Sequence, residues 1–215
     1  RQKLHKEKVW ILEDSYAGRS DREKIAELRE DLKKEHATVH ILTTLDDIAW
    51  LFNIRGNDIP HNPVALSYAA VTEKEIFLFI SLEAVPENVR TYLEELGVTL
   101  SPYQDIYTYA QDLCHERVLL EKGKVNYGIV NYLAENNRLI DKMNPTVMKK
   151  AQKTAVEIEN LKKAHIRDGV AMTKFIYWMK HNIGKIPMTE CSVADHLRQL
   201  RREQGALDES FTTIS

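Results

Sequence analysis

Three polar side chains in one loop, Arg55, Asp58 and His61, are the strongest candidates for chemistry in this chain. The planar guanidinium of an arginine binds a carboxylate through two parallel hydrogen bonds. Arg55 is therefore suited to hold a carboxylate of a substrate or of a neighbouring subunit. A structural role competes with this one, in which Arg55 and Asp58 pin the turn to an adjacent sheet. The residue types favour the structural role.

Other chemical signatures are weak in this sequence. Asp112, His115 and Glu116 would share one helical turn, but a polar helix end explains them better than a metal site does. The sequence has no His-Glu-x-x-His, no Gly-x-Ser-x-Gly and no Gly-rich phosphate loop. Cys114 and Cys191 are far apart, which predicts buried thiols in a reducing compartment rather than a disulfide framework. We therefore assign no catalytic residue and no metal ligand.

The candidate loop belongs to a run, residues 43–64, that is rich in turn-forming residues. Thr44 precedes Leu-Asp-Asp and an apolar stretch, which predicts an N-capped helix. Gly56 and the asparagine after it tolerate a positive φ, while Pro60 and Pro63 keep the residues before them extended. The chain should therefore leave a helix, turn sharply and enter a strand.

The overall charge and hydropathy exclude several classes of protein. The chain has 215 residues, with 30 basic and 32 acidic side chains, so no net field favours nucleic acid or an anionic membrane. Residues 21–24 mix acids and bases, as is typical of a solvated helix face. No apolar run approaches the ~18–20 residues of a membrane span, and no signal peptide is visible. We expect a cytoplasmic protein without nucleic-acid or membrane partners.

Short apolar runs alternate with helical patterns over the first 148 residues. Ser20 caps a helix whose Ile25, Leu28 and Leu32 recur at helical spacing. Two apolar runs joined by three polar residues predict a hairpin. The alternation predicts an α/β domain with a mixed central sheet flanked by helices. Strands are predicted at 9–12, 37–42, 64–71, 75–80, 98–100, 118–120 and 139–140, and further helices at 86–97, 102–113 and 126–133.

The organisation changes after Pro145. A long helix is predicted over 154–182, with Ile158, Leu161 and Ala164 facing inward in its first half. Its second half is apolar on nearly every side, so it must be buried between partners. A second helix, from Thr189 to Arg202, and the start of a strand at Phe211–Ser215 follow. We expect domains at 1–148 and 149–215, the second of them incomplete.

Six segments carry a family resemblance: Tyr16–Ser20, 43–64, Tyr68–Thr72, 150–171, 189–204 and 210–215. Together they resemble three-domain Xaa-Pro aminopeptidases of the creatinase/prolidase group of metallopeptidases. The resemblance covers nearly the whole chain and is most specific between residues 150 and 171. It implies that 1–148 is the second N-terminal, creatinase-like domain. Residues 149–215 would then be the first helices and strand of a pita-bread catalytic domain.

The resemblance also implies an activity for the parent protein. Such enzymes remove the N-terminal residue from peptides with proline in second position, and they use two divalent ions, commonly manganese, held by two Asp, one His and two Glu. Those ligands would lie beyond Ser215, so residues 1–215 alone are predicted to be inactive. Arg55, Asp58 and His61 would lie at the active-site rim, and the enzyme would be a cytoplasmic homodimer.

Two alternatives stay open at this point. One is a peptidase-like module that binds protein partners without cutting them. The other is a related prolidase or creatinase-type hydrolase. The residues that follow Ser215 would distinguish an enzyme from a binding module.

Overall fold

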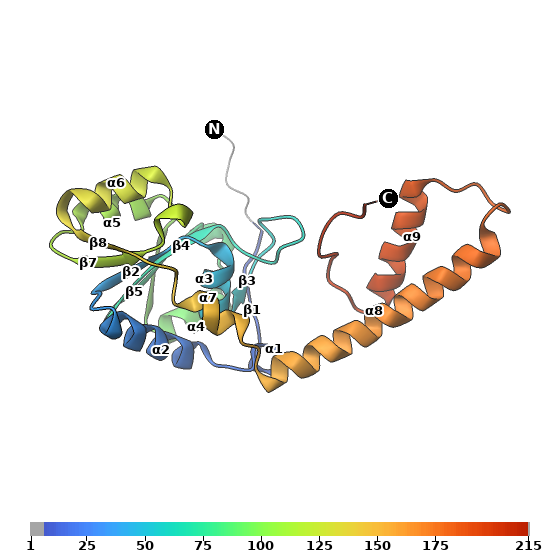
Figure 1. Cartoon of the computed structure of the whole chain (residues 1–215), viewed down its shortest axis with the longest axis horizontal. Coiled ribbons are helices and arrows are strands. Elements are labelled where there is room, and N and C mark those ends of the chain that lie inside the picture. The colour runs from blue at the N-terminus through green and yellow to red at the C-terminus, as the bar shows by residue number, and fades with distance from the viewer. Residues whose placement is uncertain (1–6, 215) are drawn as a thin grey trace.

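A six-stranded mixed sheet forms the centre of the first part of the chain (Figure 1). The structure, a computed structural model, describes residues 7–214. The strand order is β6-β5-β4-β2-β7-β8. Strand β4 is antiparallel to β2 and β5, and the remaining neighbours are parallel. The strands are β2 (Val39–Leu42), β4 (Ser67–Thr72), β5 (Ile76–Ile80), β6 (Val98–Pro102), β7 (Arg117–Leu120) and β8 (Arg138–Asp141).

Helices cover both faces of this sheet, as the apolar patterns predict. On one face the core is formed with α2 (Asp21–Lys34), α3 (Leu45–Leu51) and α4 (Glu87–Glu95). On the other face α5 (Asp105–Asp112) and α6 (Tyr127–Asn136) pack against the sheet. Neighbouring β4 residues, Ala69 and Ala70, belong to opposite cores, because successive strand side chains alternate between faces. The predicted α/β fold with a mixed sheet is confirmed.

Two short strands form a separate sheet beside this core. Strand β1 (Trp10–Ile11) pairs antiparallel with β3 (Ile54–Arg55). The helix predicted after Thr44 is present as α3, but the Thr44 side chain does not cap its backbone. The Thr44 hydroxyl donates instead to Asp47 Oδ2 at 2.5 Å. After β3 the chain turns, and β4 begins at Ser67. Short helices complete this part: α1 (Asp14–Ala17), η1 (Leu82–Ala84) and η2 (Lys122–Lys124).

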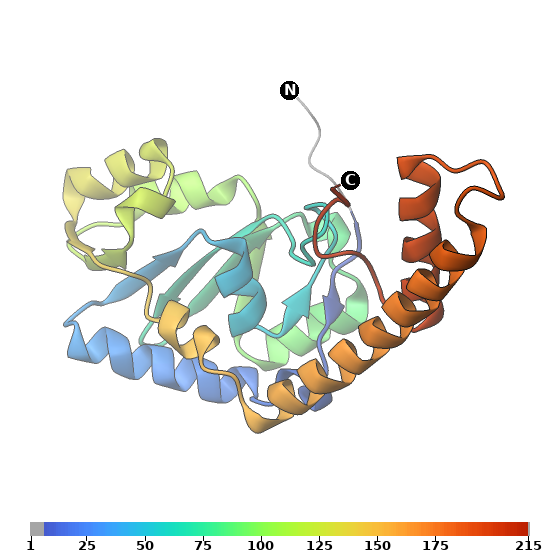
Figure 2. The same cartoon turned by 45° about the vertical axis from the view of Figure 1, so that its right-hand side comes forward.

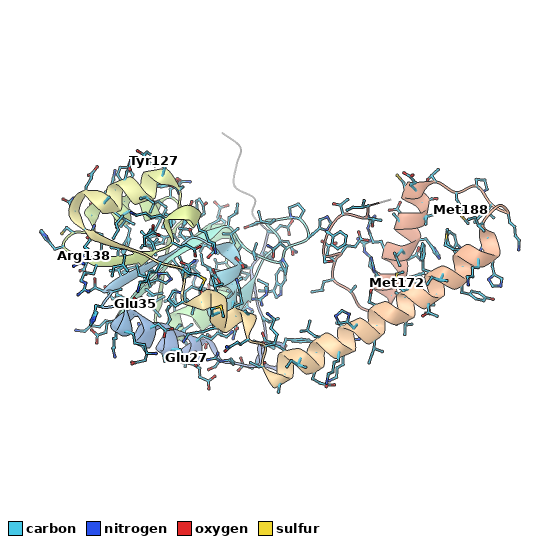
Figure 3. All side chains as sticks on the ribbon, in the orientation of Figure 1. Glu27, Glu35, Tyr127, Arg138, Met172 and Met188 are labelled. Carbon is cyan, nitrogen blue, oxygen red and sulfur yellow. The ribbon has the colours of Figure 1, made fainter. Side chains whose placement is uncertain are left out.

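A long helix then leaves the α/β unit (Figure 2). Helix α7 (Thr146–Ala151) lies against α3, and α8 (Ala155–Asn182) extends away from the sheet. Helix α9 (Glu190–Glu203) folds back onto α8. At that contact Arg201 Nε donates to Asp168 Oδ1 at 2.7 Å, and the rings of Trp178 and His196 stack with centroids 4.0 Å apart. Met172 lies at the same junction (Figure 3).

The structure differs from the sequence prediction in this second part. Ile158 and Leu161 are 44% and 47% exposed, and Ala164 is exposed too, so the prediction that they face inward is wrong. The hydrophobic period marks one side of a helix, but it does not supply a partner to cover that side. Residues 211–214 form no strand, and Ser215 lies outside the described residues. Over the described range, none of the helices combines the length and the apolar character needed to cross a membrane.

Candidate functional site

Arg55 and Asp58 bind the main chain of their own neighbourhood. Arg55 Nη1 donates to the carbonyls of Ala49 and Ile54 at 2.8 and 2.9 Å. Burial lowers the pKa of Arg55, against the opposing effect of the Glu157 carboxylate. Asp58 Oδ2 accepts the Leu66 amide at 2.8 Å. These contacts give both residues the structural role of holding the loop, and a role at an active-site rim stays a prediction.

His61 makes a longer-range connection. It has a positive φ of 62° and lies in the turn at residues 59–62. Its Nδ1 lies 3.1 Å from the carbonyl of Glu209, and its Nε2 lies 3.1 Å from Thr212 Oγ1. If Nδ1 carries the proton, a neutral ring donates to Glu209 and accepts from the Thr212 hydroxyl. His61 therefore joins the loop to the segment after α9, and it does not converge with the other two candidates.

A pair of lysines fastens α7 to the α/β unit. Lys149 Nζ lies 3.2 Å from Glu27 and 2.8 Å from Asp31, both on α2. Lys150 pairs with Asp46 and lies 2.8 Å from Asp47 Oδ1, on α3. Glu27, labelled in Figure 3, lies on α2 where this helix meets α7.

The carboxylate of Asp47 is buried in this contact. Burial opposes its ionisation, but the ammonium of Lys150 and the hydroxyl of Thr44 outweigh that effect and hold the pKa of Asp47 below its usual range. The hydroxyl oxygen of Thr44 also accepts from the side-chain Nδ2 of Asn144, at 3.3 Å. The lysines therefore position the start of the long helix that follows α7.

Lys24 is a buried cation, although the charge pattern of residues 21–24 predicts a solvated position. Lys24 is only 1% exposed, so the prediction that it lies on a solvated helix face is wrong. Its ammonium donates to the Trp50 carbonyl at 2.9 Å and to Asn53 Oδ1 at 2.5 Å, and it lies 4.7 Å from the centroid of the Trp50 ring. Burial, together with the charge of Arg55, lowers the pKa of Lys24 to about 8. Local charge alternation carries no signal for this placement.

The other sequence candidates do not form a site. Helix α5 ends at Asp112, and His115 follows with a φ of 62°, so the proposed shared helical turn is absent. Cys114 and Cys191 are both exposed, so the prediction of buried thiols is wrong. In residues 7–214 no three His, Cys, Asp or Glu side chains gather closely enough to hold a metal ion.

The chain is similar to known peptidases over nearly its whole length. Residues 1–157 match the Creatinase/Prolidase N-terminal domain. The Xaa-Pro aminopeptidase 1 of Dictyostelium discoideum is 35% identical over 98% of this chain and 34% of its own length. A probable Xaa-Pro aminopeptidase P of Talaromyces stipitatus is 36% identical over 97% of this chain and 34% of its own length. The chain thus spans about a third of these curated relatives.

Solved structures agree with the sequence comparison. The X-prolyl aminopeptidase of Caenorhabditis elegans, described as a cytosolic enzyme with a di-nuclear active site, superimposes with a TM-score of 0.90 at 31% identity. That match covers 98% of this chain and 36% of the nematode chain. An Xaa-Pro dipeptidase of Bacillus anthracis matches with a TM-score of 0.63 at 17% identity. That match covers 89% of this chain and 52% of the dipeptidase chain, and it supports the fold alone. The chain therefore belongs to the creatinase/prolidase N-terminal domain family, and its relatives over nearly all its length are Xaa-Pro aminopeptidases.

Proposed function

We propose that the chain is the accessory domain and the first catalytic-domain helices of a metallo-aminopeptidase. The enzyme removes the N-terminal residue from peptides with proline in second position. The observation that carries this proposal is the close backbone match to the nematode X-prolyl aminopeptidase over nearly the whole chain. The match extends through α8 and α9, so it includes the helices outside the residues matched to the family domain.

In this proposal residues 1–148 are the accessory domain and 149–215 open the pita-bread domain. Helix α7 crosses that boundary and is bound to the accessory domain by Lys149 and Lys150. The loop that carries Arg55, Asp58 and His61 borders the active-site mouth and restricts substrates to free peptide ends. The contact of His61 with Glu209 supports this role, because it places the loop beside the segment that leads onward from α9.

The proposed chemistry needs two divalent metal ions, which we propose to be manganese. The side chains of residues 7–214 do not fit such a pair, since they gather no ligand cluster. We propose that the ligands belong to another part of the parent enzyme and that residues 1–215 alone are inactive. The parent enzyme is proposed to be cytoplasmic, as the nematode enzyme is described to be. It is also proposed to be a homodimer.

The test uses the protein encoded by the complete parent gene and, beside it, the 215-residue chain. Paired peptides that differ only in proline or alanine at position two are incubated with each protein, with Mn²⁺ and with a chelator. Proline-dependent, chelator-sensitive release of the first residue by the full-length protein supports the proposal. Peptide binding without cleavage would identify a binding module instead. Stoichiometric Mn²⁺ binding to the 215-residue chain, measured by calorimetry, would refute the proposed location of the ligands.

A further inference from the structure

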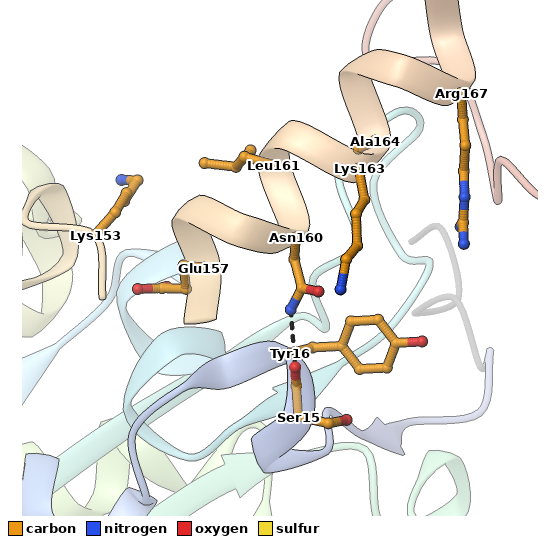
Figure 4. A pocket seen from close by; sticks show the side chains of 9 residues that line it. All are labelled: Ser15, Tyr16, Lys153, Glu157, Asn160, Leu161, Lys163, Ala164 and Arg167. Carbon is orange, nitrogen blue, oxygen red and sulfur yellow. Dashed lines mark hydrogen bonds between the residues drawn. The ribbon is translucent and has the colours of Figure 1, made fainter. Parts of the chain in front are cut away.

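We propose that the hollow between α1 and the first turns of α8 binds a small organic oxyanion, a phosphate or a carboxylate, through Lys163 and Arg167 (Figure 4). The hollow has a volume of about 680 Å³, within the usual range of ligand pockets. Lys163 reaches down from α8 toward the ring of Tyr16, which lies on the α1 side. The inference is independent of the proposed peptidase activity.

One face of α8 supplies most of this pocket. Lys163 and Ala164 follow Asn160 by three and four residues, and both precede Arg167 by four and three, so the four residues lie along the same side of the helix. Asn160 Nδ2 donates to the Ser15 carbonyl of α1 at 2.8 Å, and this bond turns that side toward α1. The two walls of the pocket are therefore held together before any ligand binds.

A glycine lets the two walls approach each other. Gly18 follows α1 with a φ of +67°, and a Cβ atom there would lie 2.2 Å from Thr154 Oγ1 at the start of α8. A side chain at this position would have to displace Thr154, whose side chain caps the helix, and would press on Val156. The close approach sets the spacing between Tyr16 and the cations of α8.

The charges in the pocket are unbalanced. The described lining residues include three cations, Lys153, Lys163 and Arg167, and a single acid, Glu157. Glu157 already accepts the Thr154 amide at 2.7 Å, and its charge also acts on the buried cation Lys24. The Lys153 ammonium donates to a backbone carbonyl at 2.9 Å.

Lys163 and Arg167 have no ion-pair partner anywhere in residues 7–214. Like charges four residues apart on a helix repel each other, and an oxyanion between them removes that repulsion. The chain as a whole carries a net charge of −2, so this cationic pair is a local feature and not a consequence of a basic protein.

The pocket chemistry indicates the class of ligand. An arginine binds two oxygens of one phosphate or carboxylate, and a lysine adds a point charge beside it. The exposed ring of Tyr16 offers a flat apolar surface on which a planar part of the same molecule can stack. A small molecule that carries an oxyanion and a flat or apolar group matches both features.

The experiment titrates the 215-residue chain with ADP, inorganic phosphate and succinate, with adenosine as the uncharged control, and follows backbone amide resonances. We expect the anions, and not adenosine alone, to shift the amides of Ser15, Tyr16 and residues 160–167. Binding of ADP and phosphate without succinate identifies a phosphate site, and binding of succinate identifies a carboxylate site. Either result supports the proposal.

Matched charge variants complete the test. Lys163→Gln/Arg167→Gln should weaken anion binding at least about tenfold, since each charge-assisted bond contributes more than a neutral one. Lys162→Gln/Lys174→Gln removes two cations of the same helix that do not line the pocket, and it should leave binding unchanged. The proposal is overturned if no anion binds at millimolar concentration, or if the two double variants weaken binding equally.

Discussion

The ion pair between Lys150 and Asp47 should make a large contribution to the stability of this protein. Lys150→Met removes an ammonium that lies 2.8 Å from a carboxylate whose side chain is only 2% exposed. The hydroxyl of Thr44 is then left to compensate most of the buried charge. Removing one partner of a buried pair costs about 3–5 kcal/mol. Lys150 is itself 25% exposed. We therefore expect the free energy of unfolding to fall by about 2–3 kcal/mol, which is less than for a fully buried pair.

Urea denaturation at neutral pH measures this loss, with Lys149→Met as the matched control. Lys149 is as exposed as Lys150, but its partners Glu27 and Asp31 are 43% and 18% exposed. After the lysine is removed, Glu27 keeps Arg19 as an ion-pair partner and Asp31 keeps Lys34. The control should therefore lose at most about 1 kcal/mol. If Lys149→Met destabilises the protein as much as Lys150→Met, burial of Asp47 is not the cause and the reasoning is refuted.

The pH dependence and a second substitution check the same cause. The pKa of Asp47 is lower in the folded protein than its ordinary value. Its contribution is therefore fully present above the unfolded value of about 3.9 and is lost as the pH falls through the folded value. The difference in unfolding free energy between the wild type and Lys150→Met should shrink in acid. Adding Asp47→Asn to Lys150→Met should recover most of the lost stability, because a neutral amide needs no counter-charge.

Three further predictions concern single residues. Between about pH 8 and 10.5 the unfolded chain holds a proton that folded Lys24 has released. The unfolding free energy of the wild type, measured in urea titrations, should therefore rise with pH relative to that of Lys24→Met. A difference between the two free energies that falls as the pH rises contradicts this prediction. Gly18→Ala should destabilise the protein more than Gly97→Ala. A Cβ atom at Gly97 meets no atom within 4 Å, so that substitution incurs only the left-handed backbone strain of about 1–2 kcal/mol. Equal losses of stability in thermal unfolding would show that the α1–α8 contact is not tight. Cys114 and Cys191 are exposed, so both should be alkylated in the native protein, as mass spectrometry would show, and protection of either contradicts the structure.

Local signals explain why much of the fold could be read from the sequence. The Ser20 and Thr154 side chains accept the third helical amides of α2 and α8, as their positions before acidic first turns suggest. The hairpin of β4 and β5 follows from two apolar runs with a three-residue polar connection. Each of these features involves residues close in sequence, so the pattern and the structure agree.

Contacts between distant segments could not be read in this way. Lys24 is buried because α3 and Asn53 supply acceptors for its ammonium, although it stands among charged neighbours in sequence. The side of α8 that carries Ile158 is apolar in pattern and still exposed, because the described chain places nothing over it. Segment 211–214 has strand-like residues, yet a strand forms only where another strand supplies hydrogen-bond partners.

The candidate site shows the same division. By itself the sequence determined the family resemblance, the order of helices and strands, and a turn-rich loop that carries Arg55, Asp58 and His61. Only the tertiary structure decided that Arg55 and Asp58 hold that loop, that His61 reaches the segment after α9, and that Lys163 and Arg167 face α1 without an acid between them. The physical reason is that helix and strand signals act over a few residues. Burial and charge pairing depend instead on which distant surfaces the fold brings together.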